Sequence, residues 1–554
     1  MSSHVYCSTP QLTDILQLRH VYLSKRHFLT ASKQLISWFS ANISITTHQI
    51  LVIFSESNFF IVIFLINKTC RNYWRRQGHE ALKETLNLKH NMNVAKNVIV
   101  FMGDGMDVST VTATRIYKGQ KNHRSGEEEH LIWDKFPHVA MLKTYSLDRQ
   151  VPDSSCAATA YLCGVKANFK TVGVDGRVKF NDCKSSIGAS VDSIATWSIA
   201  EGKDAGIIAT SRVTDSSPGA TFGHSASKKW ESDASIPISE RRCKDMARQL
   251  VEDYPGRKFK VILGGGRGNF LPNSTFDVEA NSSNFRQDSR NLINLWKNDK
   301  KSKNLTYAYV KNLQELKKVN STSTDYLLGL FAHRNMDYEL DHKKKGNTQP
   351  SLPEMTEKAI SILSKNSRGY FLFVEGSRID HAHHFNHAAQ ALEETYQLER
   401  ALKVALKMTN LNETLIIVTA DHGHGMTITG NPKRGNPILG SLEGENFADG
   451  LPFTTLLYSN GPGYDVDSDG KRVNLTNVDT QNKDFMMPAG FPRTGSKHGG
   501  QDVQAFAIGP MSHLFHGTQE QTYLAYAMAY ASCVGANKDH CMDHGSNRNE
   551  SKRG

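Results

Sequence analysis

Three segments far apart in the chain are continuous runs of apolar, largely β-branched residues that end in ionisable side chains. They cover residues 97–103, 370–374 and 415–420, and they are followed by Asp104, by Glu375 and by Asp421 and His422. Short continuous apolar runs are typical of buried parallel strands. Because ligands bind beyond the carboxyl ends of the strands in open α/β sheets, the pattern predicts that these side chains share one site.

The rest of the pattern predicts one large α/β domain that carries two insertions. Residues 425–497 are rich in Gly, Asn, Asp and Pro and predict loops with a strand at 454–457. Residues 273–325 predict a second surface insertion with a helix at 285–296. With 554 residues and 39% apolar content, the chain is long enough to bury a large core.

A candidate nucleophile lies in the segment Val151-Pro-Asp-Ser-Ser-Cys-Ala-Ala-Thr-Ala160. It sets Asp153 directly beside Ser154 and follows both with small residues on an apparent helix, which lets a bulky tetrahedral anion approach closely. Asp-Ser is also a common turn dipeptide. The weight of this segment therefore depends on the other candidates.

Candidate metal ligands occur in two further segments. In Arg378-Ile-Asp-His-Ala-His-His384, Asp380 and His384 are one helical turn apart, so both can face one ion if a helix begins there. His381 then points elsewhere or supports a ligand from behind. Lys497-His-Gly-Gly500 offers His498 as a further nitrogen ligand. Mixed imidazole and carboxylate ligands favour Zn²⁺, whereas an all-oxygen set favours Mg²⁺.

Taken together, these motifs resemble the animal branch of the alkaline phosphatase family over about residues 72–541. The blocks that carry the resemblance are residues 97–115, 151–166, 371–384, 418–424 and 502–521. The resemblance implies a large, mostly parallel central sheet flanked by helices, with residues 425–497 as a crown-type loop insertion that packs at a dimer interface.

The resemblance also implies a set of site residues. Ser154 would be the nucleophile, with one zinc ion held by Asp380, His384 and His498 and a second by Asp104, Asp421 and His422. A magnesium ion would be held by Asp104, Ser217 and Glu375. Supporting residues would be Asp153, Asp215, His381 and His424, and disulfides would join Cys183 to Cys243 and Cys533 to Cys541. The implied reaction is hydrolysis of phosphate monoesters, on small molecules or proteins, through a phosphoserine at alkaline pH.

Four positions depart from the family pattern. Lys228 stands where the family clamps phosphate with arginine, and lysine lacks the bidentate fork, so we expect slower turnover or weaker phosphate binding. Asp215 replaces a supporting histidine, Asp107 replaces a glycine, and Cys156 replaces a smaller residue. An alternative function is therefore a catalytically weakened homologue that acts as a cell-surface binding glycoprotein. Diester or sulfate hydrolysis is a weaker option, because Asp153-Ser154 does not match the sulfatase motif.

A peripheral calcium site of vertebrate members is only partly reproduced. Glu279 and the backbone of Phe331 match, but Ala332 and Gln349 stand where two carboxylates are expected. Because calcium needs several oxygen ligands, usually with charge, calcium is not expected here.

The remaining features concern location and partners. The net charge is +11, but the basic residues are scattered, so nucleic acid is not an expected partner. The cysteines and the Asn-x-Ser/Thr sequons, such as that at Asn273, suggest an exported glycoprotein. Residues 1–71 form an N-terminal extension whose apolar stretch at about 50–66 is a signal core, an uncleaved membrane anchor or the product of an overextended gene model. The family domain is expected over 72–545, and the polar tail 546–554 carries no signal for a lipid anchor.

Overall fold

The computed structural model describes residues 71–342, 346, 348–442, 448–536 and 538–541. By its internal contacts the chain divides into two units, residues 1–89 and 90–554. In the first unit, helix α3 (Arg71–Leu86) has no buried residue. The apolar stretch at 50–66 and the tail 546–554 lie outside the described residues, and the predicted domain boundary at 72 stays a prediction. Among the described helices, none has the length and apolar character needed to cross a membrane.

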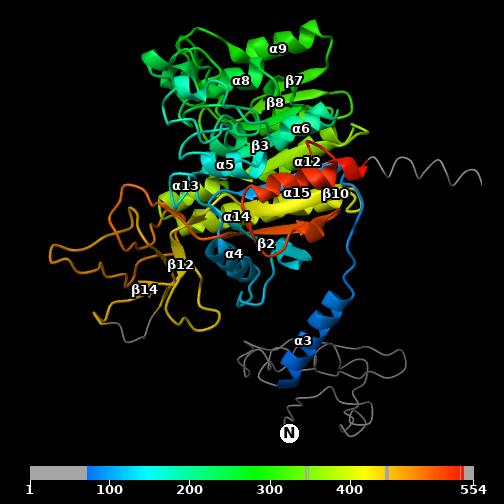
Figure 1. The fold of residues 1–554 in the computed structure, drawn as a ribbon. Coiled ribbons are helices and arrows are strands. Elements are labelled where there is room, and N and C mark those ends of the chain that lie inside the picture. The colour runs from blue at the N-terminus through cyan, green and yellow to red at the C-terminus, as the bar shows by residue number, and fades with distance from the viewer. Residues whose placement is uncertain (1–70, 343–345, 347, 443–447, 537, 542–554) are drawn as a thin grey trace, which may run out of the picture. The chain divides into compact units, whose positions relative to one another are not determined.

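The second unit is built on a ten-stranded sheet (Figure 1). From one edge to the other, the strands are β18 (Thr518–Glu520), β2 (His138–Lys143), β17 (Val503–Ile508), β10 (Thr414–Ala420), β1 (Asn97–Gly103), β9 (Tyr370–Gly376), β3 (Asp204–Arg212), β4 (Val261–Gly265), β8 (Tyr326–Leu330) and β7 (Tyr307–Val310). Only β17 runs against its neighbours β10 and β2, and the other pairings are parallel. The predicted α/β fold with a mostly parallel sheet is confirmed.

The three apolar runs of the sequence are adjacent central strands. Strand β1 lies between β10 and β9, and every residue of β9 and β10 is buried. Burial along a whole strand requires cover on both faces of the sheet, which explains why these strands are uniformly apolar rather than alternating.

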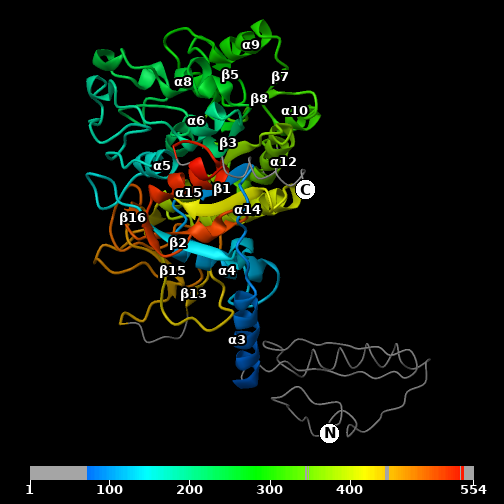
Figure 2. The ribbon, with the colours of Figure 1, turned by 45° about the vertical axis from the view of Figure 1, so that its right-hand side comes forward.

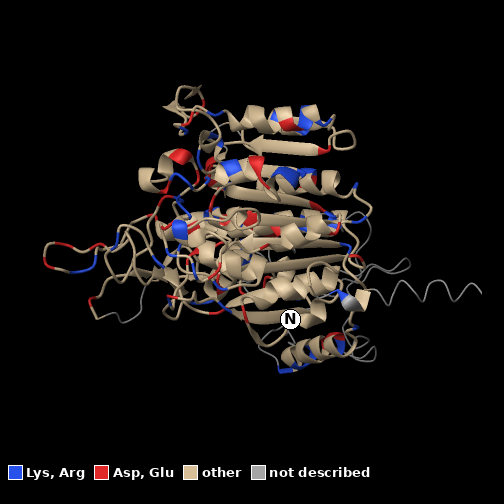
Figure 3. Ribbon diagram, turned by 45° about the horizontal axis from the view of Figure 1, so that its top comes forward, with Lys and Arg blue, Asp and Glu red and all other residues tan. Residues whose placement is uncertain are grey.

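Two groups of helices provide this cover (Figure 1, Figure 2). One group is α4 (Val108–Lys121), α12 (Leu352–Leu363) and α14 (Ala388–Met408), and the other is α5 (Ser154–Cys163), α6 (Ile194–Ala200) and α15 (Tyr523–Ser532). The remaining helices are α7 (Ser216–Gly219), α8 (Met246–Glu252), α9 (Leu292–Ser302), α10 (Leu313–Lys318), α11 (Glu339–His342) and α13 (Arg378–His384). Figure 3 shows Lys and Arg interspersed with Asp and Glu on several helices and loops, whereas α5, α6 and α15 carry no charged residue.

The prediction of a helix at 285–296 is wrong, because the helix there is α9, which begins at Leu292. The Asn291 side chain caps it by accepting a hydrogen bond from the Asn294 N–H. The preceding residues are held in an irregular path by Arg286, which is fully buried and pairs with Asp245 at 3.0 Å. The buried ion pair of Arg286 holds the backbone in a non-helical path, so residues 285–291 do not form the helix that their apolar spacing predicted.

The segment 425–497 is mostly irregular, as predicted, but the strand expected at 454–457 is two shorter ones. These are β14 (Phe453–Thr454), which pairs with β13 (Ser441–Leu442), and β15 (Leu456–Tyr458), which pairs with β12 (Met426–Ile428). A separate two-stranded ribbon joins β11 (Gly423–His424) to β16 (His498–Gly499). A third small pair, β5 (Phe276–Asp277) and β6 (Ser282–Ser283), lies in the other insertion.

Candidate functional site

The carboxyl ends of β10, β1 and β9 place three buried carboxylates at one edge of the sheet. Asp104 directly follows β1, Asp421 directly follows β10, and Glu375 lies near the end of β9 beside Met102 of β1. All three carboxyl groups are at most 6% exposed. The structure therefore brings together the acidic side chains that the three apolar runs deliver.

Ser154 lies beside the first group of candidate ligands. It is the first residue of α5, and Asp153 caps that helix by accepting a hydrogen bond from the Ser155 N–H. The Ser154 hydroxyl is 3.4 Å from Asp104 Oδ1 and 3.3 Å from His422 Nε2. His422 Nε2 in turn is 3.2 Å from Asp421 Oδ2.

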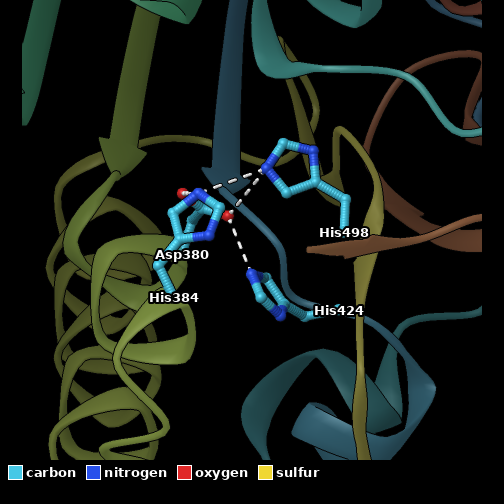
Figure 4. A group of neighbouring side chains, drawn as sticks. All are labelled: Asp380, His384, His424 and His498. Atoms are coloured by element: carbon cyan, nitrogen blue, oxygen red, sulfur yellow. Dashed lines mark hydrogen bonds and ion pairs between the residues drawn. The ribbon is translucent and has the colours of Figure 1, made fainter. Parts of the chain in front are cut away.

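A second group of side chains converges next to the first (Figure 4). His384 Nε2 is 3.1 Å from Asp380 Oδ2, because α13 sets these residues one turn apart, as the spacing predicted. His498 arrives from β16, and its Nε2 is 3.5 Å from Asp380 Oδ1 and 3.3 Å from His384 Nε2. The His498 ring also stacks on His422 with centroids 3.7 Å apart, so the two groups are contiguous.

The hydrogen bonds of the three imidazoles define their tautomers. The Nδ1 atoms of His384, His422 and His498 face the backbone carbonyls of Ser496, Gly423 and Pro152 at 2.5, 3.1 and 2.9 Å. A carbonyl only accepts, so each neutral ring carries its proton on Nδ1 and directs an Nε2 lone pair at a carboxylate. Lone pairs aimed at carboxylate oxygens repel one another unless a cation lies between them. This is the donor set and orientation of metal-ligating histidines.

The buried carboxylates point to the same conclusion. Burial raises the pKa of Glu375 to about 8. Burial and then the charge of Asp421 raise the pKa of Asp104 well above its usual range. Among the described residues, Asp380 Oδ1, Asp421 Oδ2 and Ser217 Oγ are buried without a hydrogen-bond partner. Buried acceptors left unpaired are costly, and divalent cations would satisfy them.

His424 differs from the other three histidines. Its Nδ1 accepts a hydrogen bond from the Gly425 N–H at 3.1 Å, so in the neutral ring the proton is on Nε2, which faces Asp380 Oδ1 at 3.4 Å. The Nε2 proton makes no hydrogen bond to Asp380, and a ring that turns a proton rather than a lone pair to the cluster does not ligate a metal in that state. His381 lies against Arg378, whose guanidinium is 3.2 Å from its Nδ1.

Lys228, which stands where the family has arginine, is held by Asp153, the residue before the candidate nucleophile. Lys228 Nζ is 3.0 Å from Asp153 Oδ2, and the lysine side chain is 27% exposed. Burial lowers the pKa of Lys228, but the charges of Asp153 and Asp215 raise it above its ordinary value, so the ammonium stays charged. Lys228 therefore presents a positive charge beside Ser154.

Asp215 is engaged by a cation of its own. Its Oδ2 accepts from the Arg212 guanidinium at 2.7 Å, and its Oδ1 accepts from the Ser216 N–H as the cap of α7. Arg212 also binds both carboxylate oxygens of Glu231. Sequence reasoning missed Arg212 and Glu231, because the signal for them is contact across loops and not spacing along the chain.

Comparison with known proteins agrees with this geometry. The family model described as alkaline phosphatase matches residues 95–534. The tissue-nonspecific alkaline phosphatase of Gallus gallus is 48% identical over 476 residues, which cover 85% of this chain and 91% of the relative. The chain belongs to the alkaline phosphatase family.

Further relatives extend this result. The tissue-nonspecific isozyme of Homo sapiens is 46% identical over 476 residues, covering 85% of this chain and 90% of the relative. The membrane-bound alkaline phosphatase of Bombyx mori is 43% identical over 481 residues, covering 85% of this chain and 87% of the relative. Among solved structures, the alkaline phosphatase of Thermus thermophilus aligns with a TM-score of 0.56 at 21% identity, over 81% of this chain and 93% of that one. That likeness shows the fold.

As an alkaline phosphatase, the chain is an enzyme that hydrolyses phosphate monoesters with metal ions, and the converging ligands described above suit that chemistry. The structure also joins Cys183 to Cys243 and Cys533 to Cys541, as the resemblance implied, and leaves Cys156 and Cys163 as buried thiols. The family assignment thus accounts for the motifs on which the sequence argument rested.

The positions that correspond to the calcium site of vertebrate members line a cavity of about 670 Å³, which does not include Ser154. Glu279, Phe331, Ala332 and Gln349 all border it. The Glu279 carboxylate pairs with the Arg267 guanidinium at 2.5 Å, and Gln349 donates to Asp337. The prediction that calcium does not bind stays a prediction.

Proposed function

We propose that this alkaline phosphatase transfers the phosphoryl group of a monoester to Ser154 and then to water, using two zinc ions and one magnesium ion. The observation that carries the proposal is the convergence of three Nε2 lone pairs on buried carboxylates within reach of the Ser154 hydroxyl. Mixed imidazole and carboxylate ligands are typical of zinc. Asp380, His384 and His498 would hold one zinc, and Asp104, Asp421 and His422 the other.

The magnesium ion would take an all-oxygen set from Asp104, Glu375 and Ser217. Ser217 Oγ lacks a hydrogen-bond partner among the described residues, which fits an oxygen reserved for a cation. Ser377 donates a 2.5 Å hydrogen bond to Glu375 Oε2 and so fixes the orientation of that carboxylate. When bound, the metal ions lower the pKa of hydroxyl groups and neutralise charge on phosphoryl oxygens.

In the first half of the proposed reaction, Ser154 Oγ attacks phosphorus as its proton passes to solvent. The bond from phosphorus to the alcohol oxygen breaks, and that oxygen takes up a proton from solvent. This gives a phosphoserine and releases the alcohol. In the second half, water attacks phosphorus, the bond to Ser154 Oγ breaks and inorganic phosphate leaves. Lys228, anchored by Asp153, would neutralise a non-bridging oxygen in both halves. The start of α5 contributes backbone N–H groups beside the same anion.

Other features of the proposal concern the protein in its surroundings. We infer export through the secretory pathway, with the N-terminal segment as a possible route to the membrane, and a homodimer that packs through residues 425–497. The membrane association stated in the name of the Bombyx mori relative supports the first inference.

The test is acid-quench mass spectrometry of the metal-loaded full chain, expressed in a secretory host and mixed with a simple aryl phosphate at alkaline pH. We expect phosphate on the peptide that contains Ser154 and loss of both label and turnover in Ser154→Ala. The matched control is Ser155→Ala, which removes the neighbouring hydroxyl and should keep the label. Metal analysis should give two zinc ions and one magnesium ion per chain, and unchanged turnover in Ser154→Ala would overturn the proposed nucleophile. Zinc bound at two sites without turnover would favour the binding glycoprotein instead.

A further inference from the structure

Asp107, one of the departures from the family pattern, is a fully buried carboxylate that caps α4. Its Oδ1 accepts hydrogen bonds from the Thr110 N–H at 2.8 Å and the Thr110 hydroxyl at 3.0 Å. Its Oδ2 accepts from the His424 N–H at 3.1 Å and from Gln501 Nε2 at 2.5 Å. Four donors offset the cost of burying this carboxylate, and two of them come from segments more than 300 residues away in sequence.

One of the two distant donors, His424, lies in the β11–β16 ribbon, and the other, Gln501, lies two residues beyond the end of β16. In that ribbon, Gly423 pairs with Gly499 and His424 pairs with His498. The bond to Asp107 therefore ties β11 to the N-terminus of α4, a rigid element packed on α14. Asp107 touches neither Ser154 nor the histidine rings in these contacts, so any effect it has on the site acts through the backbone.

Gln501 completes the connection from the segment that follows β16. Its Nε2 donates both to Asp107 and to the His424 carbonyl, at 2.5 and 3.1 Å. A Cβ at Gly423 would lie 2.4 Å from the Gln501 amide, and one at Gly499 would lie 2.0 Å from its Oε1. The paired glycines thus leave the space that this amide occupies across the ribbon, and side chains larger than hydrogen would displace it.

We propose that Asp107 and Gln501 are positioning residues: their hydrogen bond clamps the β11–β16 ribbon onto α4 and so fixes His422 and His498 for metal binding. The same two rings are also held by backbone, because the Gly423 carbonyl accepts from His422 Nδ1 and the Pro152 carbonyl accepts from His498 Nδ1. With the clamp closed, the three metal-facing Nε2 atoms keep their mutual spacing. This inference rests on the proposed zinc centre.

The experiment measures how fast zinc leaves the metal-loaded full chain when a chromogenic chelator is added in excess. Loss of groups that support metal ligands costs about 10- to 100-fold in metal affinity. We expect Gln501→Ala to release zinc about tenfold faster than the wild type. The control Gln519→Ala removes a half-buried glutamine from β18 whose side-chain amide donates to the His516 carbonyl rather than to the ribbon or Asp107, and it should release zinc at the wild-type rate. Thermal unfolding of the metal-free forms is the check on folding: Gln501→Ala should melt at a slightly lower temperature, because buried Asp107 loses one of its four donors, and zinc release is compared at a temperature at which all three proteins stay folded.

Two further variants separate positioning from simple charge. Gln501→Glu sets a second carboxylate against Asp107, so the clamp opens and zinc should leave faster. If only negative charge near the metal mattered, the same change would slow release, and that result would overturn the clamp. Combining Asp107→Asn with Gln501→Glu removes the pair of like charges at unchanged net charge, so the double variant should release zinc more slowly than Gln501→Glu alone; the wild-type rate is not recovered, because the bonds to the His424 N–H and carbonyl are lost.

The outcomes distinguish the clamp from the zinc centre on which it rests. A wild-type protein that binds no zinc would refute both. Zinc that leaves the wild type and Gln501→Ala at equal rates would refute the clamp alone and leave the proposed reaction intact. The experiment measures zinc release and not turnover, so it tests the clamp even in a chain that binds zinc without forming a phosphoserine.

Discussion

Replacing Lys228 with arginine is expected to raise kcat/KM for a simple aryl phosphate. The lysine ammonium already uses one N–H on Asp153 Oδ2, at 3.0 Å, and presents its remaining N–H groups from a single nitrogen. An arginine can keep the bond to Asp153 with one nitrogen while it offers two parallel N–H groups to phosphoryl oxygens.

The size of the gain follows from how firmly the anchor is held. Asp153 is buried, its Oδ1 accepts from the Lys170 N–H at 2.7 Å and its Oδ2 accepts from the Ser155 hydroxyl at 2.6 Å. The carboxylate therefore has a fixed orientation, and the arginine gains about one hydrogen bond to a charged oxygen. Such a bond contributes about 1.5 kcal/mol at the lower end of its usual range. At 1.36 kcal/mol per factor of ten, kcat/KM should rise about tenfold.

The assay is steady-state hydrolysis of the aryl phosphate at saturating zinc and magnesium, together with the inhibition constant of inorganic phosphate. Phosphate should inhibit Lys228→Arg more strongly, because the same fork binds the product. Lys228→Met keeps the length of the side chain without its donors and should lose both activity and phosphate affinity. If Lys228→Arg keeps its metals but shows no gain in either constant, the lysine is fully accommodated and the reasoning from donor geometry is refuted.

Three further perturbations test other parts of the structure. Burial raises the pKa of Glu394 to about 8, from an ordinary value of 4.5. The folded protein therefore favours the protonated carboxyl group, and the stability that this group contributes is complete below pH 4.5 and is lost as the pH rises through about 8. Melting curves of Glu394→Gln should be flatter with pH over that window, and a parallel decline would contradict the shift. Removing the Cys183–Cys243 disulfide with two serines should lower the free energy of unfolding by about 4 kcal/mol, from its sequence separation of 60, as measured by denaturant titration; no change would show that the bond is absent in solution. Burial and the charge of Lys228 lower the pKa of Lys170, which places several positive groups close together near Asp153. KM for an ester that carries an added carboxylate should therefore rise with salt concentration, and Lys170→Gln should weaken that salt dependence. An identical salt response in both proteins would exclude a role for this lysine.

Much of the fold could be predicted because its signals are local. Uniform apolar runs identify strands that are buried on both faces, and the residue after each run is placed at the sheet edge by the direction of the strand. One helical turn separates Asp380 from His384, so their shared face follows from spacing alone. The error at 285–296 has the opposite origin, since the Arg286 ion pair with Asp245 joins positions 41 residues apart and overrides local preference.

By itself, the sequence determined the class of fold, the candidate nucleophile and the ligand types, since all of these depend on residue identity and short-range periodicity. Only the tertiary structure decided which nitrogen of His384 and of His498 faces the site, because the carbonyls of Ser496 and Pro152 lie 112 and 346 positions away from these histidines in sequence. It also decided what Asp107 does. In sequence this residue is one added negative charge after Gly-Asp-Gly-Met. In the folded chain it meets Gln501, 394 positions away, because β1 pairs with β10, whose end leads into β11 and its partner β16.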